Sequence, residues 1–399
     1  MSAWTSPTSR TSPQGPAVTD PDQRVGPLPA APASVTLGGT RLGVVGAARV
    51  YVCGITPYDV THLGHASTFV WADLLASALG TTGAVPHTCR NVTDVDDVLD
   101  AAARTRGTYF DELALMQEAV FDQSMRALRV ATPSDTPHAR HHVQAVQQLA
   151  QALLDRGAAY EHDGSVLFRG AGVPAAAGLE RDAALALSRA YGDDPDAPGL
   201  EDACDVPVWR PSPAGVPGWA SPWGWGRPGW HAECAAMALG VLGSSVDVLV
   251  GGADLAYPHH AYQQAMAEAA SGVTPFARAT LHVGTVRVNG DKMAKSTGNL
   301  VLVEDVLRDT APATLRMLLL DRPVGDAWDY DPADLPQAQE RVQALYAAAA
   351  RPGGGVDGGR AVARVRDGLD VPGAVDLALE EGGETARRLL ALLKLAEPA

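Results

Sequence analysis

Residues 49–65, RVYVCGITPYDVTHLGH, carry the pattern that decides the fold. The apolar run that ends at Cys53 predicts a short buried strand, and the following segment with Pro57 predicts a loop. From Leu63 to Leu75, apolar residues recur at the spacing of a helix. A strand, a loop and a helix in this order are typical of the first unit of a nucleotide-binding α/β sheet.

Later segments extend this α/β pattern. Residues 246–250 and 280–283 predict buried strands, and residues 259–270 predict a helix. Residues 98–163 have a mostly helical pattern. Residues 170–228 are rich in Gly, Pro, Asp and Trp, which predicts a long irregular segment of the kind that often covers a site.

We therefore expect an α/β protein with three parts. Residues 1–40, rich in Pro, Ser, Thr and Ala, are expected to form a flexible N-terminal arm. Residues 41–325 are expected to form a Rossmann-like catalytic domain, interrupted by a helical insertion at about 98–200. The Ala- and Leu-rich residues 326–399 are expected to form a small helical C-terminal domain.

Composition narrows the classes of function. The chain has 399 residues, a formal net charge of -15 and 46% hydrophobic residues, which suits a folded protein but not extended binding to a nucleic-acid backbone. No apolar run approaches the roughly 18 residues of a membrane span. The N-terminus lacks the charged start and apolar stretch of a secretory signal, so we expect a cytoplasmic protein.

Two short motifs suggest phosphate binding. His62-Leu63-Gly64-His65 opens the first predicted helix, where free N–H groups and the helix dipole favour anions; the alternative is a pair of surface histidines near a cap. The 31 basic residues comprise 28 arginines and only three lysines, and two of these, Lys292 and Lys295, share one glycine-bracketed loop. Their ammonium groups suit a polyphosphate, although an ordinary exposed basic turn has the same composition.

Four cysteines occur, at positions 53, 89, 204 and 234, and none has C-x-x-C spacing. In a reducing compartment, the default for each is a small buried apolar residue. Cys53, Cys234 and His259 offer the side chains that zinc prefers, and three protein ligands leave a fourth position open. The three lie far apart in the sequence, so spacing alone does not establish a metal site.

Five separated blocks together resemble one known family, the cysteinyl-tRNA synthetase superfamily of class I aminoacyl-tRNA synthetases. The resemblance runs from about residue 51 to residue 330 in consistent order. It implies a class I aminoacyl-tRNA synthetase-like Rossmann catalytic domain that binds ATP, with Mg²⁺, and forms an aminoacyl-adenylate. The blocks are residues 51–65, 90–97, 226–231, 258–260 and 290–299.

The resemblance also implies a role for individual residues. A single Zn²⁺ would be held by Cys53, Cys234 and His259, and the thiolate of the substrate L-cysteine would fill the open position, which excludes serine. The phosphates of ATP would contact the catalytic residues His62, His65, Lys292 and Lys295. The amino acid and its adenylate would contact Gly54, Thr56, Thr93, Trp230, Gly252 and Asp254.

Two branches of the superfamily compete. A tRNA enzyme needs an anticodon-reading region, but residues 300–399 contain one lysine and no dense basic cluster. Gln263 stands where the tRNA enzymes place a glutamate against zinc. These features favour the shorter mycothiol-pathway ligases, which join cysteine to the amine of glucosaminyl-inositol. We accordingly expect small-molecule partners, no tRNA, no membrane and a monomer.

Three departures from the family pattern leave other activities open. Ala261 replaces a glutamate, Ala294 replaces a serine in the lysine loop, and Arg322-Pro323-Val324 replaces a His-Tyr-Arg stretch. A relative that transfers cysteine to another amine fits these departures. An inactive protein that senses cysteine is a third hypothesis, but retention of the implied metal ligands and phosphate contacts argues against it.

Overall fold

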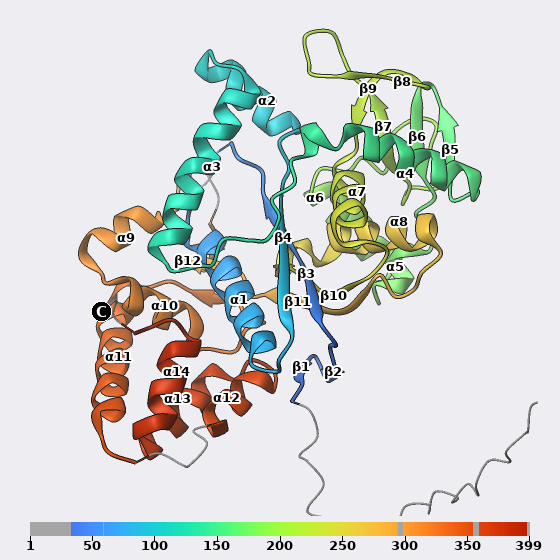
Figure 1. Cartoon of the computed structure of the whole chain (residues 1–399). Coiled ribbons are helices and arrows are strands. Elements are labelled where there is room, and N and C mark those ends of the chain that lie inside the picture. The colour runs from blue at the N-terminus through green and yellow to red at the C-terminus, as the bar shows by residue number, and fades with distance from the viewer. Residues whose placement is uncertain (1–32, 59, 294–297, 354–358, 397–399) are drawn as a thin grey trace, which may run out of the picture. The chain divides into compact units, whose positions relative to one another are not determined.

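A four-stranded parallel sheet forms the predicted nucleotide-binding unit in the computed structural model (Figure 1). The strand order is β11-β10-β3-β4, and each neighbouring pair is parallel. The structure describes residues 33–58, 60–293, 298–353 and 359–396. The predictions for the arm before residue 33 and for Ala294 and Lys295 concern residues outside these ranges. The sheet and its helices are β3 (Ala47–Ile55), α1 (Leu63–Gly80), β4 (Val85–Val92), α7 (Trp230–Leu242), β10 (Val246–Gly252), α8 (Ala261–Ser271) and β11 (Ala277–Val283).

Alternation along β3 separates two packing faces. Val50 and Val52 belong to the large core cluster that includes the buried residues of α1. Tyr51 and Cys53 belong to a different cluster, with residues of α7 and α8. Because successive side chains of a strand point to opposite faces, the register of β3 directs Cys53 toward the helix that carries Cys234.

A second sheet, antiparallel and five-stranded, follows the order β5-β6-β7-β9-β8. The expectation that residues 170–228 are irregular is wrong, because three of these strands and two helices lie there. Pro207 argues against an inner strand, yet β7 lies between β6 and β9; the ladder shifts register beside it, which accommodates a residue without an N–H. The bounds are β5 (Ala159–His162), β6 (Ser165–Phe168), α5 (Val173–Ala176), α6 (Arg181–Ala190), β7 (Val206–Pro211), β8 (Trp219–Ser221) and β9 (Gly224–Pro228).

The remaining elements precede, connect or follow the two sheets. Residues 35–42, which overlap the end of the expected arm, form a hairpin whose Val35 and Leu37 are buried. Near the C-terminus, α11 to α14 pack with α1 and α10 in one core cluster (Figure 1). The bounds are β1 (Val35–Leu37), β2 (Thr40–Leu42), α2 (Asp97–Arg106), α3 (Phe110–Ala127), α4 (Val143–Asp155), β12 (Val286–Val288), β13 (Asp291–Lys292), α9 (Val303–Asp309), α10 (Pro312–Leu320), β14 (Trp328–Asp329), α11 (Leu335–Ala350), α12 (Gly359–Arg366), α13 (Val371–Glu381) and α14 (Gly383–Leu392).

One buried ion cluster ties α1 to the C-terminal helices. The Asp73 carboxylate accepts hydrogen bonds from Arg316 Nη2 at 3.0 Å and Lys394 Nζ at 2.5 Å. It also accepts one from the backbone N–H of Ala131 at 2.9 Å. Arg316 donates further to the carbonyls of Leu128 and Leu393, so the guanidinium is held on three sides. The third lysine of the chain therefore has a structural partner.

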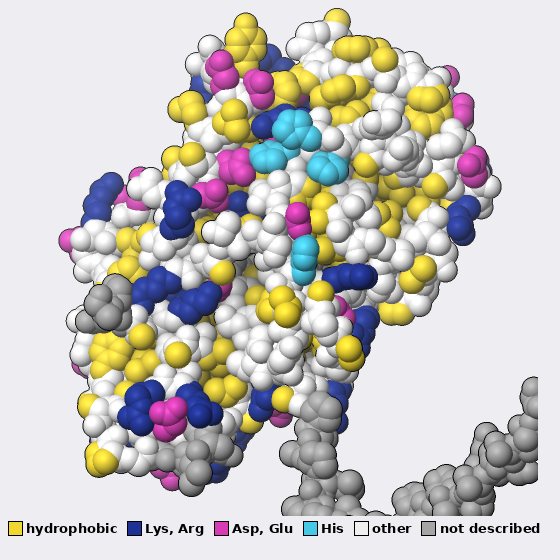
Figure 2. Space-filling view, in the orientation of Figure 1, with side chains coloured by type: hydrophobic (Ala, Val, Ile, Leu, Met, Phe, Trp, Pro, Cys, Tyr) yellow, Lys and Arg dark blue, Asp and Glu magenta, His cyan; other side chains and the backbone are white. Residues whose placement is uncertain are grey.

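The described surface mixes charges. Basic and acidic side chains lie interspersed on the face drawn in Figure 2, over the residues that the structure describes. Among the same residues, no helix combines the length and the apolar character that a membrane crossing requires.

Candidate functional site

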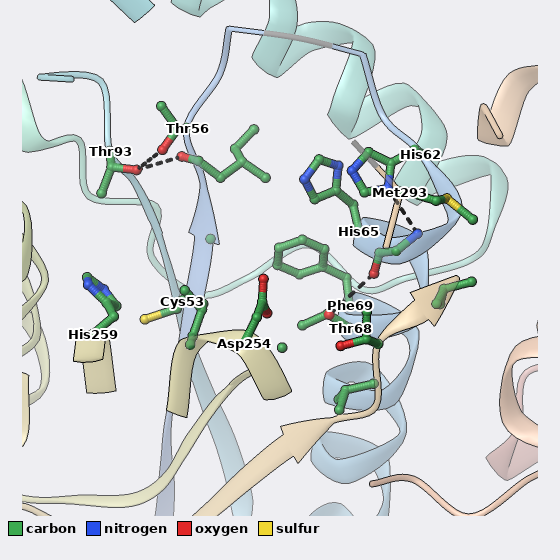
Figure 3. A pocket seen from close by; sticks show the side chains of 18 of the residues that line it. Cys53, Thr56, His62, His65, Thr68, Phe69, Thr93, Asp254, His259 and Met293 are labelled. Carbon is green, nitrogen blue, oxygen red and sulfur yellow. Dashed lines mark hydrogen bonds between the residues drawn. The ribbon is translucent and has the colours of Figure 1, made fainter. Parts of the chain in front are cut away.

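A cavity of about 820 Å³ opens where strands β3, β4 and β10 end (Figure 3). Carboxyl ends of parallel strands are where α/β sheets bind ligands, because the loops there diverge. Every implied site residue that the structure describes lines this cavity; Lys295 lies outside the described ranges. The twelve are Cys53, Gly54, Thr56, His62, His65, Thr93, Trp230, Cys234, Gly252, Asp254, His259 and Lys292.

Cys53, Cys234 and His259 form one buried group. Their sulfur and nitrogen ligand atoms all lie within 4.8 Å of one another. Cys53 lies near the end of β3, Cys234 lies in the second turn of α7, and His259 lies in the segment before α8. Among the described residues, this is the one group of three His, Cys, Asp or Glu side chains close enough to hold a metal ion.

The protonation states of His259 and Cys53 are compatible with binding of a metal ion. Burial, then the nearby His231 and His260, lower the pKa of His259 well below its usual range, so the imidazole is neutral and has a lone pair to donate. Burial raises the pKa of Cys53, so without a cation its sulfur keeps a proton. A bound metal would displace that proton, as metal sites couple binding to thiol deprotonation. The donor set fits a soft or borderline cation.

Gln263 lies beside the metal-ligating group. Its side chain is fully buried, with Oε1 3.6 Å from Cys53 Sγ and Nε2 3.5 Å from the carbonyl oxygen of Cys234. An amide at this position contributes no charge. If a divalent cation bound here, its charge and those of two thiolates would therefore sum to zero before a substrate binds.

The neighbouring wall of the cavity is built from an aromatic ring and two hydroxyls. Trp230, the first residue of α7, stacks on the His259 ring with centroids 4.2 Å apart. Thr56 and Thr93 share a hydrogen bond of 2.8 Å between their hydroxyl oxygens, and Thr93 Oγ1 also donates to the Ile55 carbonyl (Figure 3). These groups have the size and polarity to contact a small amino acid.

The start of α1 forms the opposite end of the cavity. His62 caps the helix by accepting the Gly64 N–H at 3.1 Å, and its ring stacks on His65 with centroids 3.9 Å apart. Burial, then the neighbouring His62 and Lys292, lower the pKa of His65 to about 3, so His65 is neutral near pH 7. Its buried Nδ1 has no hydrogen-bond partner among the residues that the structure describes, which leaves a polar atom available to a ligand.

Lys292 reaches the same region from β13. Its ammonium lies 2.5 Å from Asp254 Oδ2, an ion pair that joins two residues of the cavity wall. Burial acts to lower the pKa of Lys292, but the Asp254 carboxylate outweighs this effect and raises it, so the side chain is charged. Half of the Lys292 side chain is exposed, and an anion in the cavity would compete with Asp254 for it.

Sequence reasoning missed two residues that contact the group of Cys53, Cys234 and His259, and a third that contacts one of these two. Asn91, at the end of β4, donates to Cys234 Sγ at 3.3 Å. His231 Nδ1 lies 3.0 Å from His259 Nδ1, and its Nε2 lies 3.2 Å from Asp193. Asn91 could have been found from its place at the end of a strand beside Cys53. Asp193 had no such signal, because only the fold brings it near His231.

Comparison with known proteins identifies the family. Residues 43–340 match the family described as tRNA synthetases class I (C) catalytic domain. The "L-cysteine:1D-myo-inositol 2-amino-2-deoxy-alpha-D-glucopyranoside ligase" of Thermobispora bispora is 41% identical over 339 residues, which cover 83% of this chain and 84% of that protein. The ligase of the same name from Acidothermus cellulolyticus is 43% identical over 347 residues, 84% of this chain and 86% of that protein.

Solved structures bear out the fold class. Methionyl-tRNA synthetase of Mycobacterium tuberculosis, in complex with methionyl-adenylate, superposes with a TM-score of 0.62 at 18% identity, over 88% of this chain and 82% of that one. At that identity the likeness concerns the fold alone. The family match and the two ligases confirm the resemblance drawn from the sequence, and the chain belongs to the class I (C) tRNA synthetase family and, within it, to the L-cysteine:1D-myo-inositol 2-amino-2-deoxy-alpha-D-glucopyranoside ligases.

Proposed function

We propose that this protein is an ATP-dependent cysteine ligase. It activates L-cysteine as cysteinyl-adenylate, releasing pyrophosphate, and transfers the cysteinyl group to the amine of glucosaminyl-inositol, releasing AMP. One observation supports this most directly: the three metal-ligating side chains and the phosphate-binding motifs, distant in sequence, line one cavity. The names of relatives that are about 40% identical over most of their length support the choice of acceptor.

The metal in this proposal is zinc, held by Cys53, Cys234 and His259. When bound, it would supply a soft Lewis-acidic position for the sulfur of cysteine, a ligand that serine cannot replace. Trp230 lies against His259 and would close the pocket around the amino acid. The hydroxyls of Thr56 and Thr93 would hold the amino and carboxylate groups in place. The compartment consistent with four free cysteines is the cytoplasm.

The residues at the other end of the cavity would handle ATP, with Mg²⁺. The neutral His65 offers a ring nitrogen for hydrogen bonding, and the N-terminus of α1 favours phosphate oxygens. Lys292 would leave Asp254 for the phosphates and neutralise charge as pyrophosphate forms. Asp254, released, would accept hydrogen bonds from hydroxyls of the bound nucleotide. Lys295 would act with Lys292 from the same loop.

In the second step the acceptor amine attacks the adenylate carbonyl, a C–N bond forms, and the C–O bond to AMP breaks. The nitrogen gives up a proton as the amide forms. Positioning of the two reactants in one cavity would supply much of the rate. The acceptor and the monomeric state remain parts of the proposal.

The test is a pair of assays on zinc-loaded protein. ATP–pyrophosphate exchange is measured with cysteine and with serine, and AMP release is measured with and without glucosaminyl-inositol. We expect exchange with cysteine only, and AMP release that rises with the amino-sugar together with the amide mass. Exchange without acceptor-dependent AMP would redirect the search to another acceptor, either an amine of secondary metabolism or the ribose hydroxyl of a tRNA. No exchange at all would overturn the ligase proposal.

A further inference from the structure

Asn91 connects two segments of the candidate metal site. It is the next-to-last residue of β4 and is 1% exposed. Its Oδ1 accepts the backbone N–H of Gly54, the residue after Cys53, at 2.9 Å. Its Nδ2 donates to the sulfur of Cys234 at 3.3 Å. One side-chain amide therefore joins the backbone of β3 next to Cys53 to the sulfur of Cys234.

The orientation of this amide is fixed by chemistry. The N–H of Gly54 can only donate, so the oxygen of Asn91 must face it, and the NH₂ group must face the sulfur. The close approach also requires glycine at position 54. A Cβ there would lie 1.7 Å from the carbonyl oxygen of Asn91, so the backbones of β3 and β4 could not come together. The packing of β3 against β4 thus requires glycine at position 54, in addition to the substrate contact expected from the sequence.

A donor aimed at a buried sulfur has a defined effect on metal binding. Cys234 is 1% exposed, so water cannot solvate the charge that its sulfur carries as a ligand. An N–H directed at that sulfur stabilises the charged form and restricts its direction. Hydrogen bonds of this kind to metal ligands typically change metal affinity by about 10–100-fold.

We propose that Asn91 is a positioning residue of the metal site, which holds the sulfur of Cys234 in its ligating position through an N–H···S hydrogen bond. The inference rests on the proposed metal centre. It differs from the ligand assignments, because Asn91 supplies no ligand atom and acts through Cys234. The neighbouring Gln263 has no equivalent role for Cys53, since its oxygen rather than its NH₂ group lies nearest that sulfur.

Two substitutions separate the functions of the amide. Asn91→Asp keeps an oxygen for the N–H of Gly54 but turns a second oxygen toward the sulfur of Cys234. Asn91→Ala removes both hydrogen bonds. The matched control is Gln148→Glu, which adds the same charge at an exposed position of α4. The thermal midpoint of each variant establishes folding, and Asn91→Asp carries the test if Asn91→Ala does not fold.

The readouts are metal content, affinity from competition with a chromophoric chelator, and the sulfur-to-metal absorption bands of Co²⁺-substituted protein. We expect about 10–100-fold weaker metal binding in both Asn91 variants, shifted cobalt bands in Asn91→Asp, and wild-type values in Gln148→Glu. Wild-type affinity and spectra in both Asn91 variants would overturn the role of Asn91 but not the proposed metal centre. Wild-type protein that binds no metal would overturn it together with the proposed metal centre.

Discussion

Two buried polar regions of this protein share the helix α1 but differ in how completely their groups are paired. Around Asp73, in the middle of α1, the carboxylate has two cations and a backbone N–H as partners. At the start of α1, the buried ring nitrogen Nδ1 of His65 has no partner in the described part of the chain. Next to His259, the Nε2 atom of the buried His260 also has no hydrogen-bond partner among the described residues.

The difference indicates what each region does. A buried polar group without a partner reduces stability, so proteins keep such groups mainly where a ligand completes them. The Asp73 cluster is complete within the chain and links α1 to the C-terminal helices. In the cavity, among the described residues, His65 keeps an unpaired ring nitrogen, and Cys53, Cys234 and His259 form a group that could hold a cation, as expected of a region that a ligand completes.

The largest effect is expected from Cys234→Ala. Removing one of three metal ligands should abolish stoichiometric metal binding and lower cysteine-dependent pyrophosphate exchange by about 10³-fold, the upper range for losing one electrostatic group of an active site. Metal content and exchange rate measure it. Cys89→Ala is the matched control, because Cys89 is equally buried but lies outside the ligand group. Wild-type pyrophosphate exchange in Cys234→Ala would contradict the assignment of the cavity as the place where a metal and the substrates bind.

Arg316→Met tests the ion cluster around Asp73. The substitution leaves Asp73 with Lys394 and the Ala131 N–H, so we expect a loss of about 3 kcal/mol in the free energy of unfolding, the lower end for breaking a buried ion pair. Urea denaturation measures it, and metal affinity should stay unchanged. Lys394→Met, whose side chain is partly exposed, should cost less. A larger loss of metal affinity than of stability would contradict the division between the two regions.

Lys292→Met should have a smaller effect, on rate alone. Loss of the ammonium should lower kcat for pyrophosphate exchange by about 10²-fold, while KM for cysteine changes little, because the metal-ligating group is untouched. Lys292→Arg, which keeps the charge but not the compact ammonium, should recover part of the rate. If Lys292→Met instead altered cysteine KM more than kcat, the phosphate-binding role would be wrong.

The smallest effect concerns pH. With a folded pKa of about 3 for His65 against about 6.5 when unfolded, the unfolded chain takes up a proton between these values and the folded chain does not. Stability should therefore fall as pH falls below about 6.5, by at most about 1.4 kcal/mol per pH unit from this residue. His65→Gln should show a shallower decline between pH 6.5 and 5 in denaturation experiments. An identical slope in both proteins would contradict the buried, neutral state of His65.

Sequence patterns predicted the sheet better than the segments around it. The strand predicted for residues 49–53 and the helix predicted from Leu63 both formed, although the strand is longer at each end, Ala47–Ile55. Residues 170–228 were misjudged because Pro207 and many glycines suppress strand propensity, whereas pairing with β6 and β9 overrides it. The site residues were named from motifs, and their roles remain predictions.

By itself, the sequence determined the fold class, the family and the side chains available for chemistry, because these depend on local patterns and on five ordered blocks. Only the tertiary structure decided which of those side chains meet. Because side chains alternate along β3, Cys53 points to the face that α7 covers. Because Gly54 has no Cβ, β4 can lie close enough to β3 for Asn91 to contact both Gly54 and Cys234. Contacts between residues 143 positions apart, such as Asn91 with Cys234, depend on strand register and backbone approach, which no local pattern encodes.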